Sequence, residues 1–163
     1  MGCGLGRLTI DVAKCLDSGR AVGVDVWNRI EVPGNSPESA HANAEAEGVG
    51  ERVEFRDGDV LALDFEDGSF DAVTCGSLLN HFPIEKKRAG LGEIRRVLKP
   101  GGRLFLMEPV RSLITWFAFT PFGFMGLKDM KHWRRLVEEA GLRVVASPAC
   151  GGFAVIVAER PEA

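Results

Sequence analysis

Hydrophobic residues recur along this chain in two patterns, helical spacing and short unbroken runs. The first helical pattern comprises Leu5, Leu8, Val12, Cys15 and Leu16. It predicts an amphipathic helix that ends near residues 18–19. Residues 21–26 then form an apolar run that contains Asp25 close to its end, which is typical of a buried strand.

The same alternation continues to the end of the chain. Ser36 is a good N-cap with Pro37 after it, so a helix is expected from there to Gly48. Further helices are expected on the apolar face Leu91, Ile94 and Leu98, and over residues 128–140. Pro100 and the two glycines after it should end the first of these two helices in a tight turn.

Short apolar runs predict the remaining strands. They span residues 53–55, 70–75, 104–107, 142–146 and 153–158. Strands that alternate with helices indicate an α/β fold, a doubly wound, Rossmann-like and mostly parallel sheet with helices on both faces. Ligands bind such sheets beyond the carboxyl ends of the strands, so polar residues at strand ends are candidates for a site.

Composition narrows the class of protein. The 163 residues suit a single domain, 1–163, and 45% hydrophobic content provides a sizeable core. A net charge of −3 disfavours binding to nucleic acid. The four cysteines lack C-x-x-C spacing and a neighbouring histidine, so no metal site is expected. Cys15 and Cys75 are expected to be reduced core residues of a cytoplasmic protein, and His41 and His132 to be surface residues.

Three segments at strand ends are candidates for ligand binding. Gly2, Gly4 and Gly6 form a glycine turn before a helix, either a plain turn or a loop whose free amides bind an anionic group. Asp25 follows Gly6 by 19 residues at the end of the next strand, where a carboxylate either binds both hydroxyls of a ribose or caps a helix. Asp59 lies in an acidic turn after the third strand and is suited to accept a hydrogen bond from an exocyclic amine.

Two longer motifs complete the pattern: Asp-Gly-Ser-Phe-Asp at 67–71, and the stretch at 93–102 that ends in Lys-Pro-Gly-Gly. In this order and spacing the segments resemble the class I S-adenosylmethionine-dependent methyltransferases over nearly the whole chain. The resemblance implies a seven-stranded sheet with one antiparallel strand near the C-terminus. The cofactor-binding residues that it implies are Gly2, Cys3, Gly4 and Gly6 around the methionine part, Asp25 and Val26 at the ribose and adenine, Asp59 and Val60 at the adenine, and Cys75 and Gly76 near the methionine part.

One departure from the family is large. Its members have a strand before the glycine loop that ends in an acid, whereas here Met1 immediately precedes Gly2. The resemblance therefore implies that this N-terminal strand is missing from the chain. Because the strand is central in the family's sheet, its loss leaves backbone groups unpaired, and weak cofactor binding or poor folding is expected.

Candidates for acceptor binding and chemistry follow the fourth and fifth strands. His81 either takes a proton from the acceptor or packs in its loop, with Asn80 beside it. Glu108 either binds the acceptor or caps a neighbouring segment. Residues 113–127 are apolar and carry Trp116, Phe119 and Phe122, which suit a lid over a hydrophobic acceptor, an interfacial membrane or dimer contact, or plain core. The segment is too short and too interrupted to span a bilayer.

Together these features predict a methyltransferase that uses S-adenosylmethionine and acts on a small, apolar acceptor by in-line displacement. The alternative is a non-catalytic domain that binds S-adenosylmethionine in a regulatory or partner-stabilising role. A nicotinamide-dependent oxidoreductase fits less well, because Arg7 stands where the dinucleotide fingerprint needs its last glycine.

Overall fold

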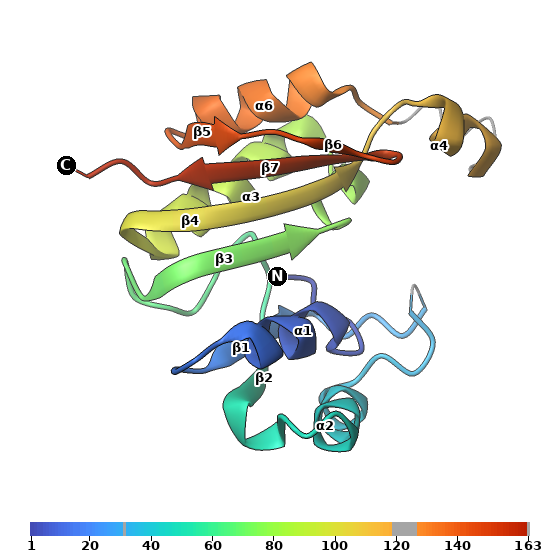
Figure 1. Cartoon of the computed structure of the whole chain (residues 1–163), viewed down its shortest axis with the longest axis vertical. Helices are drawn as coiled ribbons and strands as arrows, with labels where there is room; N and C mark the ends of the chain where they lie inside the picture. Colours follow the sequence, from blue (N-terminus) through green and yellow to red (C-terminus); the bar gives the residue numbers. More distant parts are fainter. Residues whose placement is uncertain (31, 119–126, 163) are drawn as a thin grey trace. The chain divides into compact units, whose positions relative to one another are not determined.

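The computed structural model describes residues 1–30, 32–118 and 127–162. The chain forms two compact units, Met1–Leu63 and Asp64–Ala163, which are described separately below (Figure 1). Among the described helices, none has the length and apolar character that crossing a bilayer requires.

The first unit is a small α/β layer. Its strands β1 (Ala21–Asp25) and β2 (Val53–Asp57) run parallel, in register from Ala21 opposite Val53 to Asp25 opposite Asp57. The chain crosses between them through α2 (Pro37–Ala46) and the short helix η1 (Gly50–Arg52), and α1 (Arg7–Cys15) precedes β1. As predicted, Ser36 caps α2 by accepting a hydrogen bond from the Ser39 amide. Asp25 therefore lies at the carboxyl end of a buried parallel pair.

The buried face of α1 differs from the predicted one. Thr9, Ile10 and Ala13 are buried, whereas Leu5 and Leu8 are exposed. Cys15 is exposed too, so its prediction as a core residue is wrong, although it carries a free thiol. Val12 and Leu16 of the predicted stripe are partly buried and pack against the core, so the stripe predicted the helix and part of its buried face. The small Ala13 and the half-polar Thr9 complete that face in place of Leu5 and Leu8.

The second unit is built on a mixed sheet. Its strands are β3 (Phe70–Gly76), β4 (Leu98–Pro109), β5 (Arg143–Ala146), β6 (Ala149–Cys150) and β7 (Phe153–Glu159). The order is β3-β4-β7-β5 with β6 beside β7, and β7 runs antiparallel to its neighbours. The expected antiparallel strand near the C-terminus is thus confirmed, while the strands of the described residues form two sheets instead of one.

Helices α3 (Ile84–Val97) and α6 (Met130–Glu139) pack against each other and against the sheet of the second unit (Figure 1). The other helices that the structure describes in this unit are η2 (Leu79–His81) and α4 (Leu113–Ala118). Along β4, Leu104 and Leu106 are fully buried while Phe105 and Met107 are partly exposed, so the two faces of the strand are unequally covered. Leu91 and Trp133, on the two long helices, are also fully buried.

The start of β4 differs from the prediction at one residue. Leu98 was expected on the helix, but it has extended backbone and begins the strand. Lys99 precedes a proline and cannot easily remain helical, which forces the change at this point. The predicted Pro-Gly-Gly turn is an irregularity within β4, where the register with β3 shifts and Gly101 has a φ of 75°.

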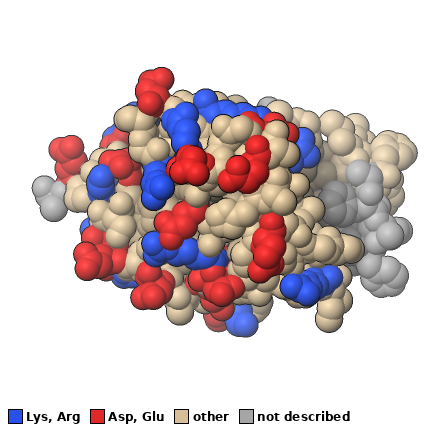
Figure 2. Space-filling view, turned by 90° about the horizontal axis from the view of Figure 1, so that it is seen from below, with Lys and Arg blue, Asp and Glu red and all other residues tan. Residues whose placement is uncertain are grey.

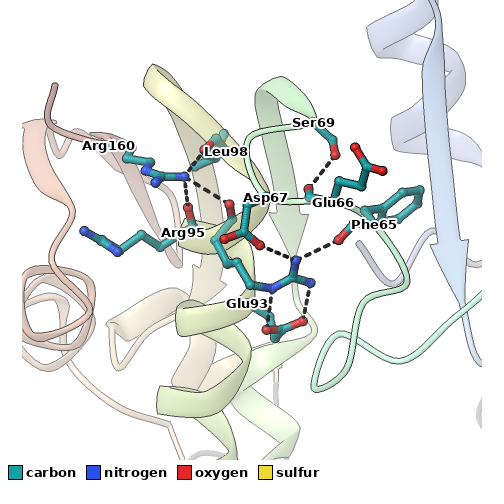
Figure 3. A network of polar contacts seen from close by, with 9 residues as sticks. Phe65, Glu66, Asp67, Ser69, Glu93, Arg95, Leu98 and Arg160 are labelled. Atoms are coloured by element: carbon teal, nitrogen blue, oxygen red, sulfur yellow. Dashed lines mark hydrogen bonds and ion pairs between the residues drawn. The ribbon is translucent and has the colours of Figure 1, made fainter. Parts of the chain in front are cut away.

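Arg96 explains why the two longer motifs occur together. Its guanidinium donates to both carboxylate oxygens of Glu93, to Asp67 Oδ1 at 2.8 Å and to the Phe65 carbonyl at 2.7 Å (Figure 3). The Arg160 side chain donates to backbone carbonyls at the end of α3 and the start of β4. These contacts fix the loop before β3 against the helix before β4.

Candidate cofactor and acceptor sites

The Asp25 carboxylate is the polar centre of the first unit. Oδ2 accepts a hydrogen bond from the Gly4 amide at 2.8 Å. Oδ1 accepts from the Trp27 amide at 2.8 Å and from the Asn35 side-chain amide at 3.1 Å. One carboxylate therefore joins the glycine loop, the end of β1 and the segment before α2.

The glycine loop holds its backbone close to Asp25. The Cys3 amide donates to the Val24 carbonyl at 3.1 Å, and Gly2, Gly4 and Gly6 all have positive φ. Within the described residues, no atom lies within 4 Å of the position that a Cβ would take at Gly4. A Cβ at Gly6, in contrast, would lie 2.8 Å from the Phe55 ring. Gly6 is thus required by packing, whereas Gly4 leaves space beside the Asp25 carboxylate.

The loop also leads into a helix start that is open to a ligand. No described side chain caps α1, whose first turn carries no acidic residue. Uncapped amides at a helix start attract anions such as carboxylates. Beside them the Cys3 thiol is protonated, because burial and the charge of Asp25 raise its pKa to about 12.

Asp59 and Val60, which were predicted to contact the adenine, lie in the turn after β2. Gly58 donates its amide to the Asp25 carbonyl at 3.1 Å, which ties the turn after β2 to β1. Asp59 is exposed and its Oδ1 accepts from the Leu61 amide at 2.9 Å. Val60 is buried and Val26 is 64% exposed. Asp25 is thus the last residue of β1 and Asp59 lies two residues beyond the end of β2, at the carboxyl ends of two paired parallel strands whose axes lie about 5 Å apart.

Sequence reasoning missed two residues of this site, Trp27 and Asn35. Trp27 has a φ of 55°, unusual for a residue with a side chain, and its amide binds Asp25. Asn35 is 2% exposed. Within the described part of the chain, neither the Trp27 indole nitrogen nor Asn35 Oδ1 has a hydrogen-bond partner, although both are buried. The only signal in the sequence is their position in the loop after β1.

In the second unit, Glu108 anchors the loop after β3. It is fully buried, and its carboxylate accepts from the backbone amides of Leu78, Leu79 and Asn80 at 3.3, 2.9 and 3.2 Å. With its amide oriented to satisfy its neighbours, Asn80 also donates its side-chain nitrogen to Glu108 Oε2 at 2.9 Å and to the Ser77 carbonyl at 3.2 Å. Four donors fill the acceptor positions of a carboxylate. The contacts therefore match the capping role that was one of the two alternatives for Glu108.

Burial also sets the charge of Glu108. Desolvation raises the pKa of its carboxyl to about 7, while the three backbone hydrogen bonds and the nearby Lys87 oppose that rise. The adjacent Cys75 thiol is buried, and burial raises its pKa to about 12. Gly76 is the half-buried last residue of β3.

The other predicted acceptor residues lie on exposed parts of the second unit. His81 ends η2 and is exposed. Trp116, on α4, is 53% exposed. Phe119 and Phe122 lie outside the described residues. Figure 2 shows acidic and basic side chains interspersed over the visible face.

Comparison with known proteins decides the family. Residues 1–102 match the model of a family described as a methyltransferase domain. The chain belongs to the S-adenosylmethionine-dependent methyltransferases. S-adenosylmethionine is accordingly the cofactor of its family.

Similar proteins support this assignment. Demethylmenaquinone methyltransferase of Thermus thermophilus is 38% identical over 133 residues, 82% of this chain and 54% of that protein. Its counterpart in Lactococcus lactis is 39% identical over 107 residues, 65% of this chain and 39% of that protein. The chain spans about half the length of the first of these relatives.

Solved structures share the fold at lower identity. An S-adenosylmethionine-dependent methyltransferase from Methanosarcina mazei has a TM-score of 0.77 at 20% identity, over 99% of this chain and 91% of that one. The [4+2]-cyclase SpnF has a TM-score of 0.79 at 20% identity, over 99% and 74%. The second example is a protein named for a different reaction on the same fold.

The residues of the first unit fit the family cofactor in their chemistry. The open space at Gly4 and the uncapped start of α1 suit the aminocarboxylate group of a methionine. Asp25 offers about four acceptor positions, of which its three present donors leave one. A ribose diol that binds both oxygens must therefore displace one of these donors.

Proposed function

We propose that the protein is a methyltransferase that binds S-adenosylmethionine through its first unit and methylates a small, apolar acceptor by in-line displacement. The hydrogen-bond arrangement at Asp25 carries the proposal. A partly buried carboxylate at a parallel strand end, held beside a glycine loop with open space at Gly4, suits a nucleoside better than a structural turn alone.

The residues of the first unit bind and orient the cofactor. Asp25 accepts from the ribose, Gly2, Cys3, Gly4 and Gly6 surround the methionine part, and Asp59 accepts from the adenine amine, with Val26 and Val60 near the ring. When bound, S-adenosylmethionine supplies an already activated methyl group, so the protein contributes mainly position and orientation.

The residues of the second unit bind the acceptor. Cys75 and Gly76 border the cofactor, and His81 takes the proton that the acceptor loses as it gains the methyl group. Asn80 is held by Glu108 and orients the acceptor, while Trp116 provides apolar contact. The name of the two relatives, demethylmenaquinone methyltransferases, supports an apolar quinone-type acceptor.

The test is transfer of a radioactive methyl group from S-adenosylmethionine to demethylmenaquinone that has been chemically reduced to its nucleophilic quinol, measured by extraction into organic solvent. We expect label in the organic phase with the wild-type chain and at least a tenfold lower rate with His81→Gln. Asp11→Asn, a change of an exposed residue on α1, is the matched control and should keep the wild-type rate.

The alternative of a non-catalytic domain predicts a different result. Such a chain binds S-adenosylhomocysteine but transfers no label to demethylmenaquinone or to any fraction of a cell extract. Binding without transfer would refute the enzymatic part of the proposal and leave its cofactor-binding part standing.

A further inference from the structure

A cavity of about 290 Å³ lies in the second unit where the chain leaves β4. Its walls are Arg111, Leu127, Lys128, Asp129 and His132. Val110 pairs with Lys128 in a parallel bridge, and the Arg111 amide donates to the Lys128 carbonyl at 3.2 Å. The backbone thus fixes two cationic residues from distant parts of the sequence side by side. We call this space the basic cavity.

The charge of the basic cavity is predominantly positive. Among the described residues of its wall, Arg111 and Lys128 are cations and Asp129 is an acid. Asp129 also serves the fold, because its Oδ1 accepts from the His132 amide at 2.7 Å and caps α6. Lys87, on α3, is 4% exposed and adds a positive charge close to His132.

One side chain in the wall of this cavity, His132, has a buried nitrogen whose hydrogen bonding is incomplete. It was predicted to be a surface residue, and that prediction is wrong because it is half-buried in the cavity wall. Its Nε2 is buried and has no hydrogen-bond partner among the described residues. A buried polar atom without a partner destabilises the fold, and such atoms are uncommon in native proteins unless a ligand or water supplies the partner.

We propose that the basic cavity binds the oxyanion of a small molecule, a phosphate, diphosphate or carboxylate group. Arg111 and Lys128 neutralise the charge, and the His132 imidazole donates a hydrogen bond to an oxygen. A metal cation is disfavoured there by the surrounding positive charges. The inference concerns the second unit alone, so its failure and that of the proposed methyl transfer are separable.

Binding should depend on pH through His132. The charged groups that act on it are Lys87 on α3, Lys128 and Asp129 before α6, and Arg135 on α6, and Arg111 lines the same cavity. Burial, followed by Lys87 and Lys128, lowers the pKa of His132, so the free imidazole is neutral at pH 7. A bound anion favours the protonated ring and raises its pKa, so binding takes up a proton and strengthens as pH falls.

The experiment is calorimetric titration of inorganic diphosphate into the full chain at constant ionic strength, at pH 6 and pH 8. After allowance for the protonation of diphosphate itself, we expect saturable binding that is at least threefold tighter at pH 6. Lys128→Ala should weaken it at least tenfold, whereas Lys131→Ala, an exposed neighbour on α6, should change it less than twofold. Absence of saturable binding, or equal losses in both variants, would overturn the proposal.

Two further arms define the ligand and the role of the imidazole. His132→Gln should still bind diphosphate, but its affinity should change with pH only as much as the titration of diphosphate itself predicts. If the variant keeps the pH dependence of the wild type, His132 does not take up the proton. Octyl phosphate is compared with inorganic phosphate to identify the source of the oxyanion. Tighter binding of octyl phosphate assigns the cavity to an apolar molecule with an anionic group, and equal binding assigns it to a free anion. Circular dichroism checks that each variant is folded.

Discussion

Glu108→Gln tests whether the buried carboxylate contributes a charge that the fold must accommodate. Glutamine keeps the size of the side chain but cannot ionise. The pKa of Glu108 is raised from 4.5 to about 7, so the folded state binds more protons than the unfolded state between these values. Through Glu108 the free energy of unfolding is therefore highest below pH 4.5 and falls as pH rises to 7. Between pH 5.5 and 8 this loss amounts to about 2 kcal/mol.

The assay is urea unfolding at pH 5.5 and pH 8, followed by fluorescence, which reports on the buried Trp133 of the same unit. Taking the difference between wild type and variant removes other titrating groups, including His132, whose lowered pKa acts in the opposite direction. Between pH 5.5 and pH 8, we expect the free energy of unfolding of Glu108→Gln to fall by about 2 kcal/mol less than that of the wild type. Glu85→Gln, at an exposed position on α3, should show the same fall as the wild type. Equal pH dependence in wild type and Glu108→Gln would refute the reasoning.

Three other predictions concern packing, ion pairs and thiols. Gly6→Ala should lower the free energy of unfolding by about 2–4 kcal/mol in urea, because it combines positive φ with a clash; Gly19→Ala shares the positive φ in open space and should lose only about 1–2 kcal/mol. Arg96→Ala should cost about 1–2 kcal/mol by the same assay, whereas Arg88→Ala, which breaks an exposed pair, should cost less than about 0.5 kcal/mol. A thiol reagent should label the exposed cysteines in the native protein but Cys75 only after unfolding, and rapid native labelling of Cys75 would contradict its burial.

The parts of the fold that depend on local chemistry were predictable from sequence. Ser36 caps α2 because its hydroxyl is the acceptor that the next turn needs. Asp25 ends β1 because an acid is tolerated where a buried strand reaches its edge. The glycine loop and Asp25 were recognised as separate candidates for one ligand, and the structure joins them through the Gly4–Asp25 hydrogen bond.

The remaining features depend on contacts between distant residues. The rotation of α1 is determined by which residues let it approach the core, and Ala13 gives no signal in an apolar count. Asn35 and His132 acquire meaning only from what surrounds them: a carboxylate in one case, and a cavity with two cations in the other. Glu108 was recognised at a strand end. The three backbone amides that donate hydrogen bonds to it lie about 30 positions away in the sequence, so no local pattern could show them.

The most direct test of the account is calorimetric titration of S-adenosylhomocysteine into the wild-type chain, Asp25→Asn and Asp11→Asn. All three should be folded by circular dichroism. We predict saturable binding to wild type and Asp11→Asn with equal affinity, and at least tenfold weaker binding to Asp25→Asn. Affinity that is unchanged in Asp25→Asn, or no binding to the folded wild-type chain, would contradict a nucleoside site centred on this carboxylate.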